Sequence, residues 1–219
     1  FYSKLKMDDL TKLIEHVVTL PKYHGLPGGH SYKGILLNAF VTKESMDAIN
    51  EIRPQANDIF MAGYCKTGTT WVQEITDLIT HKGNIEETIK SPLIERIPFI
   101  DVMTVDQIRN LDKLPKPRLL KTHLPLRMLP ENAGKIIYCV RNPKDVVVSY
   151  FYFYKMTKGL GLYSGTWDSF LEMFMNGDVL YGYYMEQVIE FYEASKINDN
   201  ILIVAFEDVK KNPVKQIRR

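Results

Sequence analysis

Cysteine is scarce in this sequence, and long apolar runs are missing. Only two cysteines, Cys65 and Cys139, occur in 219 residues, which excludes a disulfide framework. Both lie in or beside apolar segments, so we expect buried, reduced thiols in a cytoplasmic protein. No stretch approaches the roughly 18 consecutive apolar residues of a membrane span, so we expect no membrane partner.

A strong excess of charge of one sign is also missing. Lysine and arginine number 28 against 26 aspartate and glutamate, a net charge of +2. This balance argues against a dedicated nucleic-acid binder, which usually has a strongly basic face. It leaves room for a local basic pocket that binds a small anion. The composition, 45% hydrophobic and 25% charged, is that of a globular protein and excludes a disordered, collagen-like or coiled-coil chain.

The length fits one domain, at roughly 150 residues per domain as a loose guide. We therefore expect a single domain over residues 1–219. Near its end, Asn212 and Pro213 have the pattern of a helix cap and first helical position. We expect this domain to be incomplete at its C-terminus, and the start at Phe1 rather than Met leaves the N-terminus open to the same interpretation.

Strand and helix patterns alternate along the chain. Apolar runs at 59–64, 119–124, 136–140 and 201–206 predict strands, and three of them are near-continuous, as in strands covered on both faces. Helical patterns occupy 5–19, 69–80, 143–155 and 167–191, and glycine and proline predict a loop over 21–29. This alternation predicts an α/β fold with a parallel sheet, whose ligands bind beyond the carboxyl ends of the strands.

A candidate phosphate-binding loop follows the first strand, in the segment GYCKTGTTW at 63–71. A strand, a short glycine-containing turn and a helix start can hold a phosphate on backbone N–H groups. Gly68 permits the turn and Lys66 supplies positive charge. Hydroxyl donors come from Thr67, Thr69 and Thr70.

This loop departs from the Walker pattern of ATP-binding proteins. Gly63 and Gly68 have the Walker separation, but Thr69 stands where the Walker lysine would be and the lysine lies at position 66. The loop is therefore a poor match to an ATP–Mg²⁺ site. A glycine turn without any ligand is the plainer alternative. Glu207 and Asp208 after the last strand resemble a magnesium-binding pair, but nothing else calls for Mg²⁺, so we expect no metal.

A candidate base and two further candidate ligands lie at the ends of other strands. Lys121 and His123 share a face of an extended strand, where histidine can accept a proton and lysine can balance charge. A lone histidine is more often structural. Arg141 ends the third strand and suits a phosphate, with Ser149 about two turns into the following helix. That helix should begin with Asn142 as its cap.

Three segments in this order, 64–71, 121–125 and 141–150, resemble the motifs of the cytosolic sulfotransferases. The resemblance implies a three-layer parallel sheet with a P-loop-like phosphate-binding loop. It implies direct in-line transfer of sulfonate from 3′-phosphoadenosine 5′-phosphosulfate (PAPS) to a hydroxyl or amine of a small acceptor, namely a phenol, alcohol, steroid or amine. It leaves open a homodimer of the full-length form.

The resemblance also assigns roles to residues. The catalytic set is His123 as base, with Lys66 and Lys121 stabilising charge. The donor nucleotide is bound by Lys66, Thr67, Gly68, Thr69, Thr70, Trp71, Arg141 and Ser149. The acceptor is bound by Lys121, Thr122, His123, Phe99 and Phe153, the last from a run of five aromatics at 150–154 in which we expect some rings in the core and some at a cleft.

The sequence departs from the family pattern at several points. Cys65 replaces a proline, Thr67 replaces a serine, and Phe206 replaces a tyrosine whose hydroxyl helps at the nucleotide. The family's later segment that grips the 3′-phosphate, and its dimerisation motif, would lie beyond Arg219. Two alternatives therefore stay open: a non-catalytic nucleotide-binding fragment, and an ATP-dependent P-loop enzyme of the kinase type.

Overall fold

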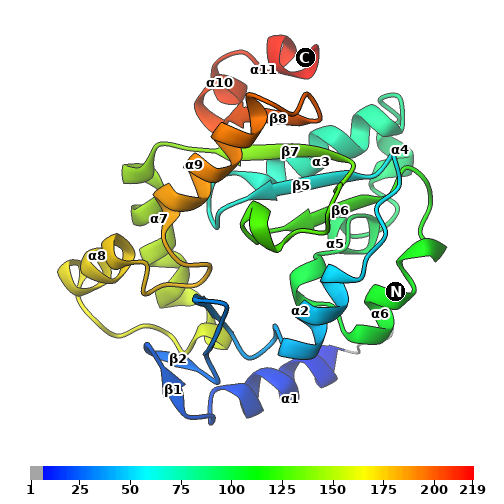
Figure 1. Ribbon diagram of the computed structural model, residues 1–219. Coiled ribbons are helices and arrows are strands. Elements are labelled where there is room, and N and C mark those ends of the chain that lie inside the picture. Colours follow the sequence, from blue (N-terminus) through cyan, green and yellow to red (C-terminus); the bar gives the residue numbers. More distant parts are fainter. Residues whose placement is uncertain (1–6) are drawn as a thin grey trace.

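A parallel four-stranded sheet forms the centre of the computed structural model, which describes residues 7–219 (Figure 1). The strands lie in the order β6-β5-β7-β8. Their bounds are β5 (Ile59–Gly63), β6 (Leu119–Thr122), β7 (Lys135–Val140) and β8 (Ile201–Ala205). The four predicted strands are therefore present, each within a residue or two of its expected bounds.

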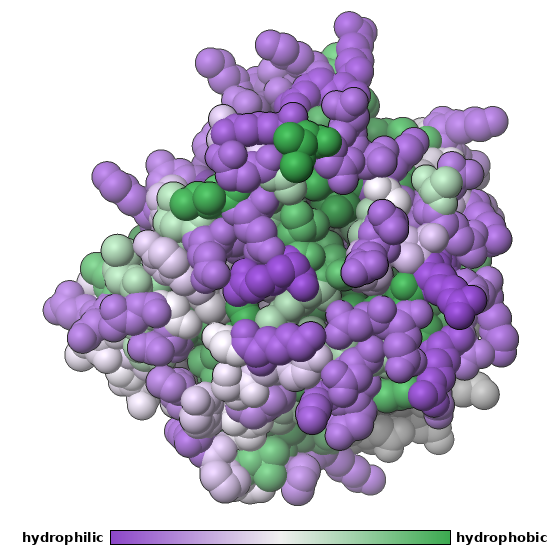
Figure 2. Space-filling view, viewed as in Figure 1, coloured by the Kyte–Doolittle hydropathy of each residue, from purple (hydrophilic) through white to green (hydrophobic). Residues whose placement is uncertain are grey.

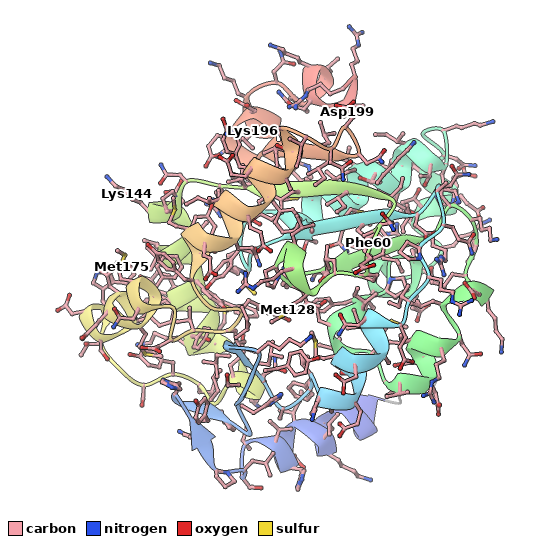
Figure 3. All side chains as sticks on the ribbon, in the orientation of Figure 1. Phe60, Met128, Lys144, Met175, Lys196 and Asp199 are labelled. Atoms are coloured by element: carbon pink, nitrogen blue, oxygen red, sulfur yellow. The ribbon has the colours of Figure 1, made fainter. Side chains whose placement is uncertain are left out.

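Both faces of the sheet are covered, as the near-continuous apolar strands predicted. Two consecutive residues of β7, whose side chains point to opposite faces, show this. Cys139 packs with Val72 of α3 (Thr69–Thr80), whereas Tyr138 stacks on Phe191 of α9 (Tyr184–Ser195) with ring centroids 4.0 Å apart. In Figure 1, α9 crosses in front of the sheet and α3 lies behind it. Phe60, the second residue of β5, is labelled in Figure 3 and is fully buried.

The remaining helices and short strands surround this centre. On the C-terminal side they are α7 (Pro143–Met156), η5 (Lys158–Leu160), α8 (Trp167–Asn176), α10 (Phe206–Lys211) and α11 (Pro213–Ile217). Before the sheet come α1 (Met7–Val17), β1 (Lys22–Tyr23), β2 (Leu26–Pro27), β3 (His30–Tyr32), β4 (Ile35–Leu37) and α2 (Lys43–Asn50). Between α3 and β7 lie α4 (Ile85–Thr88), α5 (Leu93–Arg96), η2 (Ile100–Val102), α6 (Val105–Arg109), η3 (Leu111–Lys113) and η4 (Leu126–Met128).

Several local predictions are confirmed and two are wrong. Asn142 caps α7 by accepting from the Lys144 amide at 2.9 Å. Asn212 likewise caps α11, with Pro213 as its first residue. The helix expected over 167–191 is instead two helices, because Gly177 ends α8 with a left-handed backbone at φ 78°. The loop expected over 21–29 contains the short ladder of β1 with β2.

Hydrophilic side chains cover most of the face seen in Figure 2, and apolar ones show only in small areas between them. This agrees with the balanced charge of the sequence. No helix among residues 7–219 is both long and apolar enough to cross a membrane.

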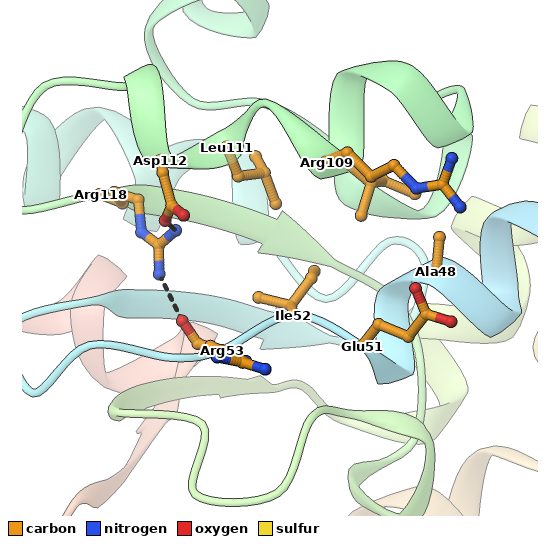
Figure 4. Close-up of a pocket in the computed structure, with 9 residues that line it drawn as sticks. Ala48, Glu51, Ile52, Arg53, Arg109, Leu111, Asp112 and Arg118 are labelled. Carbon is orange, nitrogen blue, oxygen red and sulfur yellow. Dashed lines mark hydrogen bonds and ion pairs between the residues drawn. The ribbon is translucent and has the colours of Figure 1, made fainter.

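A buried ion pair closes the amino edge of the sheet. Arg118 and Asp58 directly precede β6 and β5, and each is 1% exposed. The Arg118 guanidinium donates from Nε to Asp58 Oδ1 at 2.8 Å and also bonds Asp112 and the Arg53 carbonyl. Figure 4 shows this guanidinium in the wall of a cavity of about 200 Å³. The cavity lies at the opposite edge from the predicted ligand site, so we assign the ion pair to stability.

Replacing one partner of this pair tests that assignment. Arg118→Met should lower the free energy of unfolding by about 3–5 kcal/mol, because it leaves the Asp58 carboxylate buried without its cation. Urea unfolding measures the change. Arg127→Met is the matched control, since the Arg127 pair with Glu190, 3.0 Å apart, has an arginine 40% exposed and should contribute less than about 1 kcal/mol. Equal losses in the two variants would contradict the assignment.

Candidate functional site

The residues that directly follow the four strands lie along one edge of the sheet. Because the strands are parallel and in register, with Gly63 of β5 opposite Cys139 of β7 and Val140 opposite Ala205 of β8, their carboxyl ends align. This edge lies on the side of α7 in Figure 1. It carries the 64–68 loop, His123, Arg141 and Phe206, which the sequence placed at four separate strand ends.

The 64–68 loop is a tight turn that leads into α3. Lys66 and Gly68 have left-handed backbones, with φ 71° and 96°. The buried Thr67 hydroxyl donates to the Tyr64 carbonyl at 2.7 Å and so holds the turn. Trp71 and Val72 donate to the Gly68 carbonyl, whereas the amides of Thr69 and Thr70 lie in the first turn, where helical N–H groups have no acceptor within the helix. These amides suit an anion.

Phe206 packs against this turn and connects it to Arg141. A Cβ on Gly68 would come within 2.6 Å of the Phe206 ring, so only glycine fits there. The exposed Trp71 meets the same ring edge-on at 5.8 Å, and the Arg141 guanidinium lies over it at 4.5 Å. Although Phe206 lacks the tyrosine hydroxyl of the family pattern, its ring contacts both halves of the predicted nucleotide site.

Arg141 has an unsatisfied buried donor. Its Nη1 donates to the Lys66 carbonyl at 3.2 Å, while its Nε is buried and has no hydrogen-bond partner in the described chain. A buried guanidinium N–H without a partner costs free energy, so this group favours an anionic ligand. Ser149 is half-buried on α7. Among residues 7–219 no hydrogen bond joins Ser149 to Arg141, so their shared role stays a prediction.

Two lysines rest on aromatic rings. The Lys66 ammonium lies 4.6 Å from the Phe153 ring centre, and the Lys121 ammonium lies 4.2 Å from that of Phe99. Burial lowers the pKa of Lys121, and the charge of Lys66 lowers it further, so the two ammonium groups act on each other. The two phenylalanines predicted to line the acceptor site are thus beside the two predicted catalytic lysines.

His123 is held as a neutral ring with one free nitrogen. Phe99 meets the ring edge-on at 5.1 Å, so Lys121 and His123 share this phenylalanine, as their spacing predicted. His123 Nδ1 lies 2.5 Å from the Gly63 carbonyl, which can only accept, so Nδ1 carries the proton and Nε2 keeps its lone pair. Burial lowers the pKa of His123 to about 3, with Lys121 adding to the effect. The ring is therefore neutral at pH 7, with Nε2 unprotonated.

Thr122 occupies a different place from the predicted one. It was expected to contact the acceptor, but its side chain is fully buried. Its hydroxyl donates to Asp101 at 2.6 Å and accepts from the Leu124 amide at 3.0 Å. Asp101 was not among the predicted site residues, although a single acid inside the apolar run IPFIDV at 97–102 was a usable signal.

Glu207 has a structural partner that the magnesium-pair alternative did not foresee. Its carboxylate accepts from the Asn142 amide at 2.9 Å, at the start of α7. Among the described residues, no group of three or more histidine, cysteine, aspartate or glutamate side chains is placed to hold a metal ion.

Comparison with known proteins identifies the family. Residues 56–219 match the family described as the sulfotransferase domain. The chain belongs to the sulfotransferase family. Rat sulfotransferase 1A1 is 40% identical over 194 residues, which cover 85% of this chain and 66% of the relative. Dog sulfotransferase 1A1 is 39% identical, with 85% and 65% covered, so the matched chain spans just under two thirds of these relatives.

Solved sulfotransferase-like structures confirm the predicted fold. Mouse sulfotransferase SULT7A1 complexed with PAP matches with a TM-score of 0.73 and 32% identity, over 87% of this chain and 66% of that one. Retinol dehydratase in complex with androsterone and the inactive cofactor PAP matches with a TM-score of 0.73 and 25% identity, over 94% and 71%. The α/β architecture expected of a sulfotransferase is therefore present here.

The fit between Gly68 and Phe206 gives one prediction. Gly68→Ala should destabilise the fold more than Gly83→Ala, because both have a positive φ but only a Cβ at position 68 meets another residue. The backbone strain costs about 1–2 kcal/mol at either position, and the clash adds about 1–3 kcal/mol at Gly68. Urea unfolding of both variants measures the difference. If the two losses are equal, the Phe206 contact does not constrain the turn.

The buried His123 ring gives a prediction about pH. Its folded pKa of about 3 lies below the ordinary value near 6.5, so the unfolded chain binds the proton more readily. The free energy of unfolding should therefore fall as pH drops from about 6.5 towards 3, by up to about 1.4 kcal/mol per pH unit. Asp101, with a pKa raised to about 6, opposes this trend between pH 6 and its ordinary value near 4.

Comparison with His123→Gln isolates the histidine contribution to this pH dependence. In this variant the free energy of unfolding should depend less steeply on pH between about 6.5 and 3, by an amount that corresponds to close to one proton. Unfolding in urea at stepped pH values measures both slopes. Identical slopes for the two proteins would show that His123 is not buried in its neutral form.

Proposed function

We propose that this chain carries the donor and transfer site of an enzyme that moves sulfonate from PAPS to a hydroxyl or amine of a small acceptor. One observation carries the proposal: a neutral histidine with a free Nε2 lies close enough to Lys121 and Lys66 for their charges to lower its pKa, at the same sheet edge as a phosphate loop and Arg141. Two of the similar solved structures, SULT7A1 and retinol dehydratase, hold PAP, which supports the same nucleotide here.

The geometry supports a separate role for each site residue in a direct in-line transfer. His123 Nε2 takes the acceptor proton as the acceptor atom bonds to sulfur and the bond from sulfur to the 5′-phosphate oxygen breaks. Lys66 and Lys121 stabilise charge on the transferring group and the leaving phosphate. The Gly68 turn binds the 5′-phosphosulfate, with Thr69 and Thr70 amides as donors, while Arg141 with Ser149 binds the 3′-phosphate and Trp71 lies near the adenine.

Further features belong to the same proposal. Phe99 and Phe153 line the acceptor site, which takes a phenol, alcohol, steroid or amine. No residue role requires a metal ion, since lysines, hydroxyls and amides supply the positive charge and donors. We propose a cytoplasmic setting on the buried, unpaired Cys65 and Cys139, no nucleic-acid partner on the charge balance, and a homodimer for a full-length form.

The alternatives make different demands. A kinase-type enzyme would need a lysine at position 69, where the chain has Thr69. A non-catalytic nucleotide-binding protein would bind PAP without transferring sulfonate. Measurement of transfer distinguishes this second alternative from the proposal.

His123→Ala tests the proposal. Isothermal titration with PAP in EDTA, with ATP–Mg²⁺ as control nucleotide, should show metal-independent binding of PAP alone that the variant retains within a few-fold. Transfer from labelled PAPS to a panel of a phenol, a steroid alcohol and an arylamine should fall by about 10²–10⁴-fold. The matched control is His16→Ala, at an exposed position, which should keep both PAP binding and sulfonate transfer.

Two results would contradict the proposal. Binding of ATP–Mg²⁺ in preference to PAP would favour a kinase-type site. Binding of PAP without transfer to any acceptor, in wild type and in His16→Ala alike, would favour the non-catalytic alternative.

A further inference from the structure

Asp101 is a buried carboxylate that forms no ion pair among the described residues, although the charge of Lys121 acts to lower its pKa. It lies in η2 and is fully buried. Among residues 7–219 no lysine, arginine or histidine forms an ion pair with it, unlike the buried Asp58, which bonds Arg118. Burial raises the pKa of Asp101 to about 6, so its charged form costs free energy in the folded state. A buried acid kept at such a cost needs a reason beyond packing.

Its hydrogen bonds converge on the base. The two carboxylate oxygens accept from the Thr122 hydroxyl at 2.6 Å and from the His123 amide at 2.8 Å. Thr122 is the last residue of β6, and His123 directly follows it. Gln187 donates to the His123 carbonyl at 2.8 Å, so the backbone of His123 is held by side chains on both sides. The ring itself is held at Nδ1 by Gly63.

The same carboxylate also holds a strained residue beside the ring. Tyr181 has φ 66°, an unusual conformation for an aromatic residue, and is buried. Its hydroxyl bonds to Asp101, its amide donates to the Leu36 carbonyl at 2.9 Å, and its ring meets His123 edge-on at 5.5 Å. Such strain costs on the order of 1–3 kcal/mol and is found where surrounding contacts require it.

We infer that Asp101 is a positioning residue of this site: by accepting from the His123 amide and the hydroxyls of Thr122 and Tyr181, it fixes the His123 ring with Nδ1–H on Gly63 and Nε2 free. It does not touch the reacting atoms. The consequence for transfer rests on the proposed function above. The consequence for the ring does not, because the tautomer is a property of the protein without substrate.

The experiment measures the tautomer of the His123 ring directly. Two-dimensional ¹H–¹⁵N NMR of the histidine rings, assigned with His123→Gln, should show one neutral Nδ1–H tautomer for His123 at pH 7 in the wild type. Asp101→Asn keeps the shape but offers only one oxygen, so we expect a second tautomer or a broadened ring signal. Where transfer is measurable, kcat should fall by about 10²-fold, as for a misplaced catalytic group, with the Kd for PAP within two-fold of the wild type.

Matched variants separate positioning from general stability. Asp58→Asn alters another buried acid and should lower stability while leaving the His123 signals unchanged. Thr122→Val and Tyr181→Phe each remove one donor to Asp101 and should change the His123 ring signals in the same direction as Asp101→Asn does. Thr122→Ser keeps the hydroxyl and should leave those signals unchanged. These variants carry the test if Asp101→Asn fails to fold.

The outcomes are distinct. An unchanged Nδ1–H ring in Asp101→Asn, or in both single-donor variants if that protein is unfolded, overturns the inference. A changed ring in a protein that neither binds PAP nor transfers sulfonate supports the positioning role and contradicts the proposed function. A changed ring with kcat reduced and the Kd for PAP unchanged supports both.

Discussion

The hydrogen bond between the His123 ring and the Gly63 carbonyl links the two strand ends on which the site is built. Gly63 is the last residue of β5 and directly precedes the 64–68 loop, so this contact joins His123 to the start of that loop. A Cβ at Gly63 would come within 2.9 Å of the Cys139 carbonyl and of the Thr67 hydroxyl. Glycine is thus required at the point where β5, β7 and the loop meet.

Positive charge gathers at this edge, and among the described residues none of Lys66, Lys121 and Arg141 forms an ion pair. Lys66 and Lys121 lie against aromatic rings, a contact that contributes about 0.5–2 kcal/mol. Arg141 lies over the Phe206 ring with one buried N–H unsatisfied. The aromatic rings therefore accommodate cations that would otherwise repel one another in a partly buried space. Asp101 accepts hydrogen bonds from the Thr122 hydroxyl and the His123 amide, and its charge acts to raise the pKa of Lys121.

Local patterns predicted the parts of the fold that depend on neighbouring residues. The bounds of α3, the Asn142 cap and the four strands follow from apolar spacing and capping chemistry, which a few adjacent residues determine. The division of 167–191 into two helices depends on Gly177 ending α8, and the helical pattern that continues on both sides of Gly177 did not reveal it. The loop, base and Arg141 were predicted because each follows a strand, and parallel strands bring such residues to one edge.

The supporting contacts of the site could not be predicted in this way. Asp101 is 22 residues from His123 along the chain, and its partner Tyr181 comes from the loop between α8 and α9. No periodicity links these positions, because they meet only after the chain has folded around the sheet. Thr122 shows the same limit: its motif suggested a ligand contact, while its burial and hydrogen bonds give it a role in holding the strand end.

The buried pair of Arg118 and Asp58 lies at the far end of the strands from His123. Five residues of β5 at about 3.3 Å each separate the two edges, a distance over which substitutions usually have additive effects. Substitutions at one edge should therefore not interfere with those at the other. A lineage with this architecture can gain or lose thermal tolerance at the amino edge while the residues of the carboxyl edge change, so the two edges are free to evolve separately.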